Sequence, residues 1–210
     1  MRAFIYTGGK IEPKNIPEAP EKDDITIAAD SGYRNAHLLG VKPQILLGDF
    51  DSLPREELNE AADGAEVITV PAQKDFTDTQ LAVETALKKG AKEIIIVGGL
   101  DGRLDHTLSN LAIVEIFKDL GVRGYITNGK NRMRYIENDS IIIMRSGYKY
   151  LSLIAKGEKV KGVTVEGCKY PLKNKLLSDK NQYAISNEIE GNCAFISVKK
   201  GKLLIIESND

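Results

Sequence analysis

Short apolar runs alternate with helix-like stretches through residues 1–120, and this alternation limits the fold more than any other feature of the chain. Each apolar run has three to five residues, and polar or glycine residues follow it. Such runs are typical of strands that are buried on both faces of a sheet. The five predicted strands are Ala3–Thr7, Ile25–Ala29, Ile45–Leu47, Val67–Val70 and Ile94–Val97.

Helix-like stretches separate most of these strands. Thr77 and Gln80 have the T-x-x-Q spacing of a capping box, which predicts a helix that begins at Asp78. The repetition of strand, helix and strand indicates a parallel sheet with helices on its faces. The predicted helices are Ser31–Leu39, Arg55–Ala62, Asp78–Lys89 and Thr107–Leu120.

The pattern changes after about Asn138. Strand-like runs continue with turn signals such as Lys156-Gly157 between them, and no helical periodicity remains. This indicates a small antiparallel β-sandwich or barrel. We therefore expect an α/β domain with a mainly parallel sheet at residues 1–134 and a smaller all-β sandwich domain at residues 135–210. The predicted strands of the second domain are Ile141–Met144, Tyr150–Ile154, Val160–Val165, Tyr183–Ser186, Ala194–Val198 and Leu203–Ile206.

Charge and cysteine content exclude several classes of protein. The formal net charge is -1, so we expect no bulk attraction to nucleic acid or to membranes. No signal peptide is visible after Met1 and the apolar runs are too short to cross a bilayer, so a cytoplasmic location is the default expectation. Cys168 and Cys193 lie in no C-x-x-C or Cys/His cluster, which argues against a zinc site.

Acids and glycines follow each predicted strand of the first domain. Because the carboxyl ends of parallel strands lie at one edge of a sheet, where ligands of open α/β sheets bind, we expect these residues to share one site. In chain order, the residues after the five strands are Gly8 and Gly9; Asp30; Asp49 and Asp51; Lys74, Asp75 and Asp78; and Asp101, Arg103 and Asp105.

This set of side chains suits phosphoryl transfer. Many carboxylates in one place favour a bound cation, and Mg²⁺ takes one or two carboxylates and completes its coordination with water and phosphate oxygens. Lys74 and Arg103 can offset phosphate charge. Each motif alone is weaker: Asp49-x-Asp51 is often a solvated turn, and Asp78 suits the start of any helix.

Several familiar nucleotide and hydrolase motifs are missing. The chain has no G-x-x-x-x-G-K-[ST] sequence, no G-x-G-x-x-G after the first strand and no G-x-S-x-G. Their absence argues against a P-loop kinase, a dinucleotide oxidoreductase and the usual serine hydrolase. Asp105-His106 invites a metal interpretation, but a structural histidine is the preferred one.

The ordered motifs resemble those of the thiamine pyrophosphokinase (thiamine diphosphokinase) family. The likeness extends over nearly the whole chain, and the ordered set is specific although no single motif is. The matching segments are Ala29–Gly32, Gly48–Ser52, Lys74–Asp78 and Gly98–His106 in the first half and Ile185–Glu188 in the second.

The resemblance implies a transferase of thiamine diphosphate biosynthesis, a kinase that moves pyrophosphate from ATP to the thiamine hydroxyl and releases AMP. It implies an ATP- and magnesium-binding catalytic domain, a thiamine-binding and dimerisation domain, and a homodimer whose two sites are each built from both subunits. The implied magnesium ligands are Asp49, Asp51 and Asp78. The implied phosphate and substrate contacts are Asp30, Lys74, Arg103 and Asp105, and the implied thiamine contacts are Tyr170, Ser186 and Asn187. From their position after the first strand, Gly8 and Gly9 are expected in the nucleotide site.

Some assignments stay open on the residues alone. Asp30 and Asp105 are both candidates for the group that orients the thiamine hydroxyl or accepts its proton. Tyr170 is either an aromatic wall for thiamine or an ordinary tyrosine on a sheet surface. Two other functions also use such acids: a metal-dependent phosphoesterase, and a nucleotide-sensing dimer without catalysis.

Overall fold

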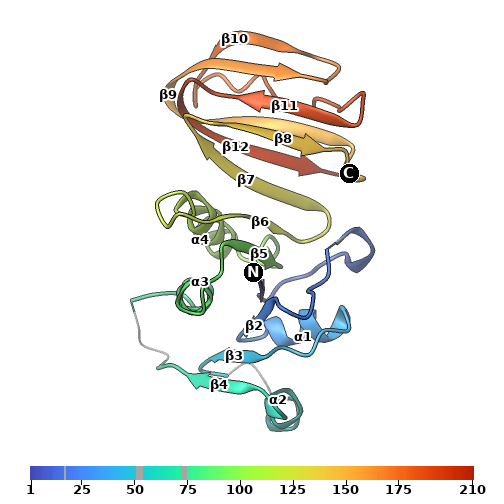
Figure 1. Cartoon of the computed structure of the whole chain (residues 1–210), viewed down its shortest axis with the longest axis vertical. Helices are drawn as coiled ribbons and strands as arrows, with labels where there is room; N and C mark the ends of the chain where they lie inside the picture. Colours follow the sequence, from blue (N-terminus) through green and yellow to red (C-terminus); the bar gives the residue numbers. More distant parts are fainter. Residues whose placement is uncertain (17, 51–53, 72–74) are drawn as a thin grey trace. The chain divides into compact units, whose positions relative to one another are not determined.

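The computed structural model describes residues 1–16, 18–50, 54–71 and 75–210. The chain divides into two compact units, Met1–Gly129 and Lys130–Asp210 (Figure 1). The expected boundary at residues 134 and 135 falls inside a strand of the second unit, β7 (Asn131–Glu137), which pairs along its whole length with β12 (Lys200–Ser208). In the part of the chain that is described, no helix has the length and apolar content needed to span a bilayer.

The first unit is built on a parallel sheet, as the sequence predicted, with the strand order β4–β3–β2–β1–β5–β6. Its last strand was not predicted because Gly124 interrupts a short apolar run. A Cβ on Gly124 would lie 1.9 Å from the carbonyl oxygen of Ile94, so glycine lets this strand approach its neighbour closely. The strands are β1 (Arg2–Tyr6), β2 (Ile25–Ala29), β3 (Ile45–Gly48), β4 (Glu66–Thr69), β5 (Glu93–Val97) and β6 (Arg123–Thr127).

The helices of this unit are α1 (Gly32–Leu38), α2 (Arg55–Ala62), α3 (Asp78–Lys88) and α4 (Leu104–Glu115), with a short 3-10 helix η1 (Pro13–Asn15) after β1. The capping box at the start of α3 is confirmed: the Gln80 amide donates to Thr77 Oγ1 (3.2 Å) and the Thr77 amide donates to Gln80 Oε1 (2.9 Å). Helix α4 begins and ends earlier than predicted, because its first turn starts directly after the glycine turn at Gly102.

The helices cover both faces of this sheet. Ala36 of α1 packs with Tyr6 and Val97 on one face. Connections between parallel strands are right-handed, so the direction in which a connection runs along the sheet decides which face its helix covers. The connections that contain α3 and α4 run in the opposite direction to that of α1, so these two helices lie on the other face. The first turn of α1 lies directly against the end of β1, since a Cβ on Gly32 would lie 2.0 Å from the Tyr6 carbonyl oxygen. The carboxyl ends of the central strands therefore open between helices of both layers.

The second unit is antiparallel and β-rich, as predicted, around one apolar core. Two predicted runs, Tyr150–Ile154 and Val160–Val165, are parts of a single 17-residue strand. Gly157, with φ of 116°, marks an irregularity inside that strand and not a turn. Besides β7 and β12, the strands are β8 (Ser140–Met144), β9 (Tyr150–Glu166), β10 (Leu172–Leu177) and β11 (Cys193–Ser197).

One predicted strand of this unit is wrong. Residues 183–186 form no strand, and the segment is attached to β9 by the hydrogen bond from the Leu153 amide to the Ala184 carbonyl (2.7 Å) and by an isolated bridge between Leu151 and Asn187. Its alternating apolar residues gave a strand signal, but Ser186 has a positive φ of 55°, which ends extended pairing there.

Candidate active site

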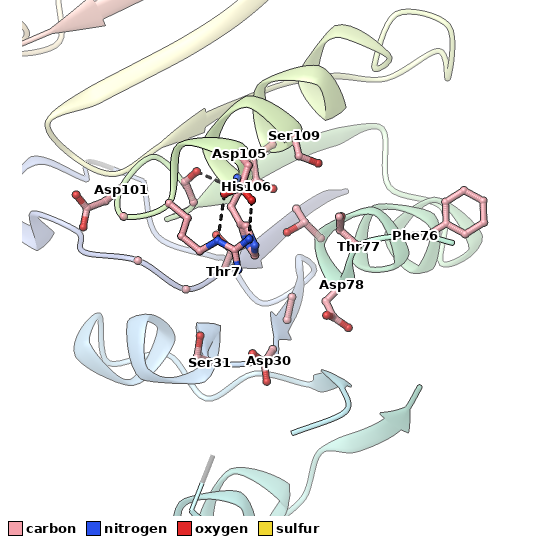
Figure 2. A pocket seen from close by; sticks show the side chains of 18 residues that line it. Thr7, Asp30, Ser31, Phe76, Thr77, Asp78, Asp101, Asp105, His106 and Ser109 are labelled. Carbon is pink, nitrogen blue, oxygen red and sulfur yellow. Dashed lines mark hydrogen bonds and ion pairs between the residues drawn. The ribbon is translucent and has the colours of Figure 1, made fainter. Parts of the chain in front are cut away.

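A cavity of about 730 Å³ opens at the carboxyl edge of the parallel sheet (Figure 2). Its walls come from the segments after β1, β2 and β5 and from the first turns of α3 and α4. Strands β1 and β5 are neighbours in the sheet but are far apart in the chain, since the winding direction reverses between them. Ligands of open α/β sheets bind at such a reversal point, so the fold itself marks this cavity as a candidate site.

Seven of the predicted site residues line this cavity: Gly8, Gly9, Asp30, Asp78, Asp101, Arg103 and Asp105. Asp75 is exposed and is not among the lining residues. Asp49 follows β3 and is half-buried, but it is not among the lining residues. Asp51 and Lys74 lie outside the described residues.

Asp30 has a strained backbone at the end of β2. Its φ is 48°, and its amide donates to the Leu47 carbonyl at 2.8 Å, which fixes the turn against β3. A non-glycine residue in this region costs about 1–3 kcal/mol, and such strain gathers at functional sites. Phe50, next to Asp49, also has a positive φ of 58°. Two of the predicted motifs therefore contain a residue with a positive φ.

Asp78 is the first residue of α3 and lies half-buried on the cavity wall (Figure 2). The capping box of Thr77 and Gln80 fixes the start of this helix, so the direction of the Asp78 side chain is set by regular structure. The positive end of the helix dipole favours a carboxylate here. Asp78 therefore presents carboxylate oxygens to the cavity from a fixed helix start.

Arg103 and Asp105 form a two-point ion pair beside the cavity (Figure 2). Arg103 Nη2 and Nε donate to the two carboxylate oxygens of Asp105 at 2.6 and 3.1 Å, and the amide of His106 donates to Oδ1 at 3.0 Å. The hydrogen bond from Arg103 lowers the pKa of Asp105 below its usual value, and the same bond raises the pKa of Arg103. Asp105 is therefore a weak base in this arrangement.

The donor set of the cavity suits a hard cation. Across the described ranges, no group of three or more His, Cys, Asp or Glu side chains is arranged to hold a metal by itself. Mg²⁺ does not need such a cage, because one or two carboxylates with substrate phosphates are enough. Asp30 and Asp78 supply two carboxylates to the same cavity.

Polar residues of α4 form a wall that the motifs alone did not reveal. Ser109 and Asn110 line the cavity together with Asp105 and His106. These four positions fall on one face of a helix, and that spacing was the available signal. We expected His106 to be a structural histidine, and this expectation is wrong, because the residue is exposed and lines the cavity.

The second unit has a smaller cavity of about 80 Å³, with a largely apolar wall. Two predicted thiamine contacts, Tyr170 and Asn187, line it, whereas Ser186 does not. Ser186 is exposed, and its amide donates to Ser152 Oγ at 3.0 Å. Tyr183 was missed, although it lies close in sequence to the Ser186-Asn187 motif. The remaining walls are Leu151, Leu153, Val165, Leu172, Ala184 and Ile185.

The side chain of Asn187 holds the backbone of Tyr170. The Tyr170 amide donates to Asn187 Oδ1 (2.9 Å), and Asn187 Nδ2 donates to the Tyr170 carbonyl (2.8 Å). Asn187 is 9% exposed, whereas Tyr170 is 58% exposed. The carboxamide is thus engaged within the protein, and the exposed aromatic ring is the part available to a ligand.

Two family models match the chain, one in each unit. The model described as thiamin pyrophosphokinase, catalytic domain, matches residues 17–125. The model described as thiamin pyrophosphokinase, vitamin B1 binding domain, matches residues 139–203. The order and extent of the matches follow the two units of the fold.

Full-length relatives show the same likeness. The thiamine pyrophosphokinase of Bacillus subtilis (strain 168) is 31% identical over 98% of both chains. A crystal structure of thiamine pyrophosphokinase from Bacillus subtilis covers 100% of both chains with a TM-score of 0.89 and 27% identity. One from Geobacillus thermodenitrificans has a TM-score of 0.86 and 30% identity, covering 100% of this chain and 98% of its own.

Proposed function

The chain belongs to the thiamin pyrophosphokinase family and transfers pyrophosphate from ATP to thiamine, and from that premise we propose how its residues share this work. The observation that carries the proposal is the cavity at the edge of the parallel sheet, where glycine loops, carboxylates and an arginine meet. The first unit binds the nucleotide and is catalytic, and the second binds thiamine and forms the dimer.

ATP binds in the larger cavity with its phosphates toward Gly8, Gly9 and Arg103. Glycines let backbone amides approach phosphate oxygens, and the guanidinium offers positive charge and N–H donors to them. Arg103 is already held by Asp105, so its fork has a defined direction before the nucleotide arrives. Lys74 adds a second positive charge to this site.

Magnesium is the cofactor that suits these acids. Asp49, Asp51 and Asp78 are its proposed ligands, with Asp30 close to the same phosphates. When bound, the ion would neutralise charge on the phosphate oxygens. The remaining work falls to the side chains, which align the two substrates and offset the charge that develops during transfer.

The reaction is an in-line displacement at the β-phosphorus of ATP. A bond forms between the thiamine hydroxyl oxygen and this phosphorus, while the bond to the oxygen that bridges the α- and β-phosphates breaks. AMP leaves with that oxygen, and the hydroxyl proton passes to a base. The ion pair with Arg103 lowers the pKa of Asp105 and makes it the weaker base, so we assign the orienting or accepting role to Asp30, which lines the same cavity.

Thiamine binds against the second unit. The small cavity offers the apolar wall that an aromatic cation needs, and the Tyr170 ring at its edge can stack on that cation. Its volume suits one ring of thiamine and not the whole molecule. The rest of the thiamine molecule would lie in the nucleotide site of a partner subunit, so that each complete site is shared by the two chains of a homodimer. We also propose a cytoplasmic location for this dimer.

The test is incubation with Mg-ATP, with and without thiamine. We expect AMP and thiamine diphosphate to form in equal amounts, and only when thiamine is present. Phosphate or AMP release without thiamine would favour a phosphoesterase. Nucleotide binding without turnover would favour a sensor, and either result would contradict the proposed function.

A further inference from the structure

Two buried carboxamides, on helices at opposite faces of the sheet, hold glycine loops of the larger cavity. Asn35 is on α1 and Asn110 is on α4, and each is 7% exposed. Both donate hydrogen bonds to backbone carbonyls of the glycine loops that follow β1 and β5. A buried amide with such bonds is costly to replace, so their placement deserves a physical explanation.

Asn35 bridges the loop after β1. Its Nδ2 donates to the Thr7 carbonyl at 2.6 Å and to the Gly9 carbonyl at 2.9 Å. The two acceptors lie on either side of Gly8, so one side chain fixes both ends of this turn. Gly9 has a φ of 93°, a conformation that glycine adopts without strain.

Asn110 holds the loop after β5, and that loop holds the first one. Asn110 Nδ2 donates to the Gly99 carbonyl at 3.1 Å, and the Gly99 amide donates to the Gly8 carbonyl at 2.8 Å. A Cβ on Gly99 would lie 2.5 Å from Asn110 Nδ2, so only glycine leaves room for this contact. A chain of hydrogen bonds therefore runs from α1 through both loops to α4.

The direction of these bonds matters for an anionic ligand. The carbonyl oxygens of Thr7, Gly8, Gly9 and Gly99 each accept a hydrogen bond from the protein. Their negative ends are thus directed at protein donors and are kept from turning toward phosphate oxygens, which they would repel. Loops that are fixed in this way need little rearrangement when a polyphosphate binds.

We propose that Asn35 and Asn110 are positioning residues, whose carboxamides hold the Gly8–Gly9 and Gly98–Gly99 loops in the shape that receives the phosphates of the nucleotide. This inference rests on the proposed function, because it takes a nucleotide as the ligand of the larger cavity. Asn35 is not among the lining residues and acts through its loop, whereas Asn110 lines the cavity and also holds its loop.

The test compares Asn35→Ala and Asn110→Ala with the unchanged chain in steady-state kinetics. We expect the KM for ATP to rise by about 10-fold or more, because small displacements of positioning groups have effects of that order. The KM for thiamine should stay unchanged. Calorimetry with a non-hydrolysable ATP analogue should show the same loss of affinity.

The matched control removes another side-chain carboxamide that bonds to the backbone of the same sheet. Gln44 Oε1 accepts from the Thr26 amide at 3.1 Å, at the opposite edge of the sheet. Gln44→Ala should lower the Tm and leave both KM values unchanged. Asn110→Ser, which keeps a hydroxyl donor, should recover part of the nucleotide affinity and serves where the alanine variant does not fold.

An unchanged affinity for the ATP analogue in folded variants would overturn the inference, and so would equal losses for ATP and thiamine. The proposed function fails by a different measurement, the absence of thiamine-dependent AMP from the unchanged chain. Calorimetry with the ATP analogue tests the positioning role of Asn35 and Asn110 whether or not the unchanged chain turns over thiamine.

Discussion

Asp78 has a structural and a chemical role that one substitution separates. Asp78→Asn keeps the shape of the first residue of α3 but removes the anionic oxygen from the cavity. Removing a group that supports a metal ligand typically lowers metal affinity or activity roughly 10–100-fold, so we expect turnover to fall by at least that factor. Stability should fall by only about 0.3–1 kcal/mol, the usual value of a favourable charge at a helix start. Thiamine-dependent AMP formation across a magnesium titration, with thermal unfolding, measures both effects.

Glu84→Gln is the matched control for this substitution, because Glu84 is an exposed acid on the same helix outside the cavity. It should leave turnover unchanged. Near-normal activity of Asp78→Asn at limiting magnesium would show that this carboxylate is not part of the site.

Asn187 and Tyr170 should behave as one unit toward thiamine. Tyr170→Ala removes the aromatic ring. Asn187→Ala removes the two hydrogen bonds that hold the Tyr170 backbone, and with it the position of the ring. Both hydrogen bonds are internal to the protein, so Asn187→Ala acts through the placement of the ring, and we expect it to raise the KM for thiamine by no more than Tyr170→Ala does.

A double-mutant cycle measures this coupling. Because both substitutions disturb the same ring, we expect the double variant to be no worse than Tyr170→Ala. Additive effects on the thiamine KM would instead mean that Asn187 contacts thiamine directly.

Site residues were predictable where they follow a strand. Asp30 comes directly after a predicted strand, Arg103 and Asp105 lie in the loop and first helical turn after another, and the topology brings such positions to one edge. The loop-holding roles of Asn35 and Asn110 were not predictable, because their partners are backbone carbonyls 28 and 11 residues away along the chain. No local pattern distinguishes an asparagine with that role from one that caps or packs.

At the scale of elements, strands buried on both faces were predicted well because their apolar runs are continuous. The errors concern strands with mixed composition. The residues of β10, with sequence Leu-Lys-Asn-Lys-Leu-Leu, are mostly exposed and give no alternating pattern. Gly157 of β9 suggested a turn, but long pairing with β12 carries the strand through it. Tertiary pairing thus decided what local propensity left open.

An ion pair ties the amino ends of β1 and β2, and its loss should depend on pH. Arg2 Nη2 donates to Asp24 Oδ2 at 2.6 Å, and the Arg2 amide donates to Oδ1 at 3.0 Å. Burial opposes ionisation of Asp24, but the hydrogen bonds from Arg2 and the backbone outweigh it, so the pKa lies below its ordinary value of 3.8. The stabilising effect of ionised Asp24 is therefore complete above about pH 4 and is lost as the pH falls through the lowered pKa.

Asp24→Asn should accordingly reduce the free energy of unfolding by about 1–3 kcal/mol at neutral pH, as expected when a buried hydrogen-bonded acceptor is weakened. The difference from the unchanged chain should shrink below about pH 4. Urea unfolding at a series of pH values measures it. Asp63→Asn, which breaks an exposed pair with Lys42, should not change the urea midpoint. A difference for Asp24→Asn that is independent of pH would refute the electrostatic explanation.

At the scale of the whole molecule, the decisive feature is the position of β1 in its sheet. The chain adds β2, β3 and β4 on one side of β1 and then β5 and β6 on the other. The sequence predicted a parallel sheet with acids at one edge, but strand order depends on long-range pairing that no local pattern contains. The reversal between β1 and β5 is what selects the loops after β1, β2 and β5 as one site.

The proposed dimer makes a prediction that no single chain can meet. If each site takes its nucleotide residues from one subunit and its thiamine residues from the other, two inactive variants should complement each other. We propose mixing Asp78→Asn chains, defective in the first unit, with Tyr170→Ala/Asn187→Ala chains, defective in the second. After subunit exchange, each mixed dimer should contain one intact site and one doubly defective site, so activity should return in proportion to the mixed species counted by native mass spectrometry. Each variant alone, carried through the same exchange, is the control. Mixed dimers that form without any return of activity would mean that each chain completes its own site, and the shared-site proposal would be wrong.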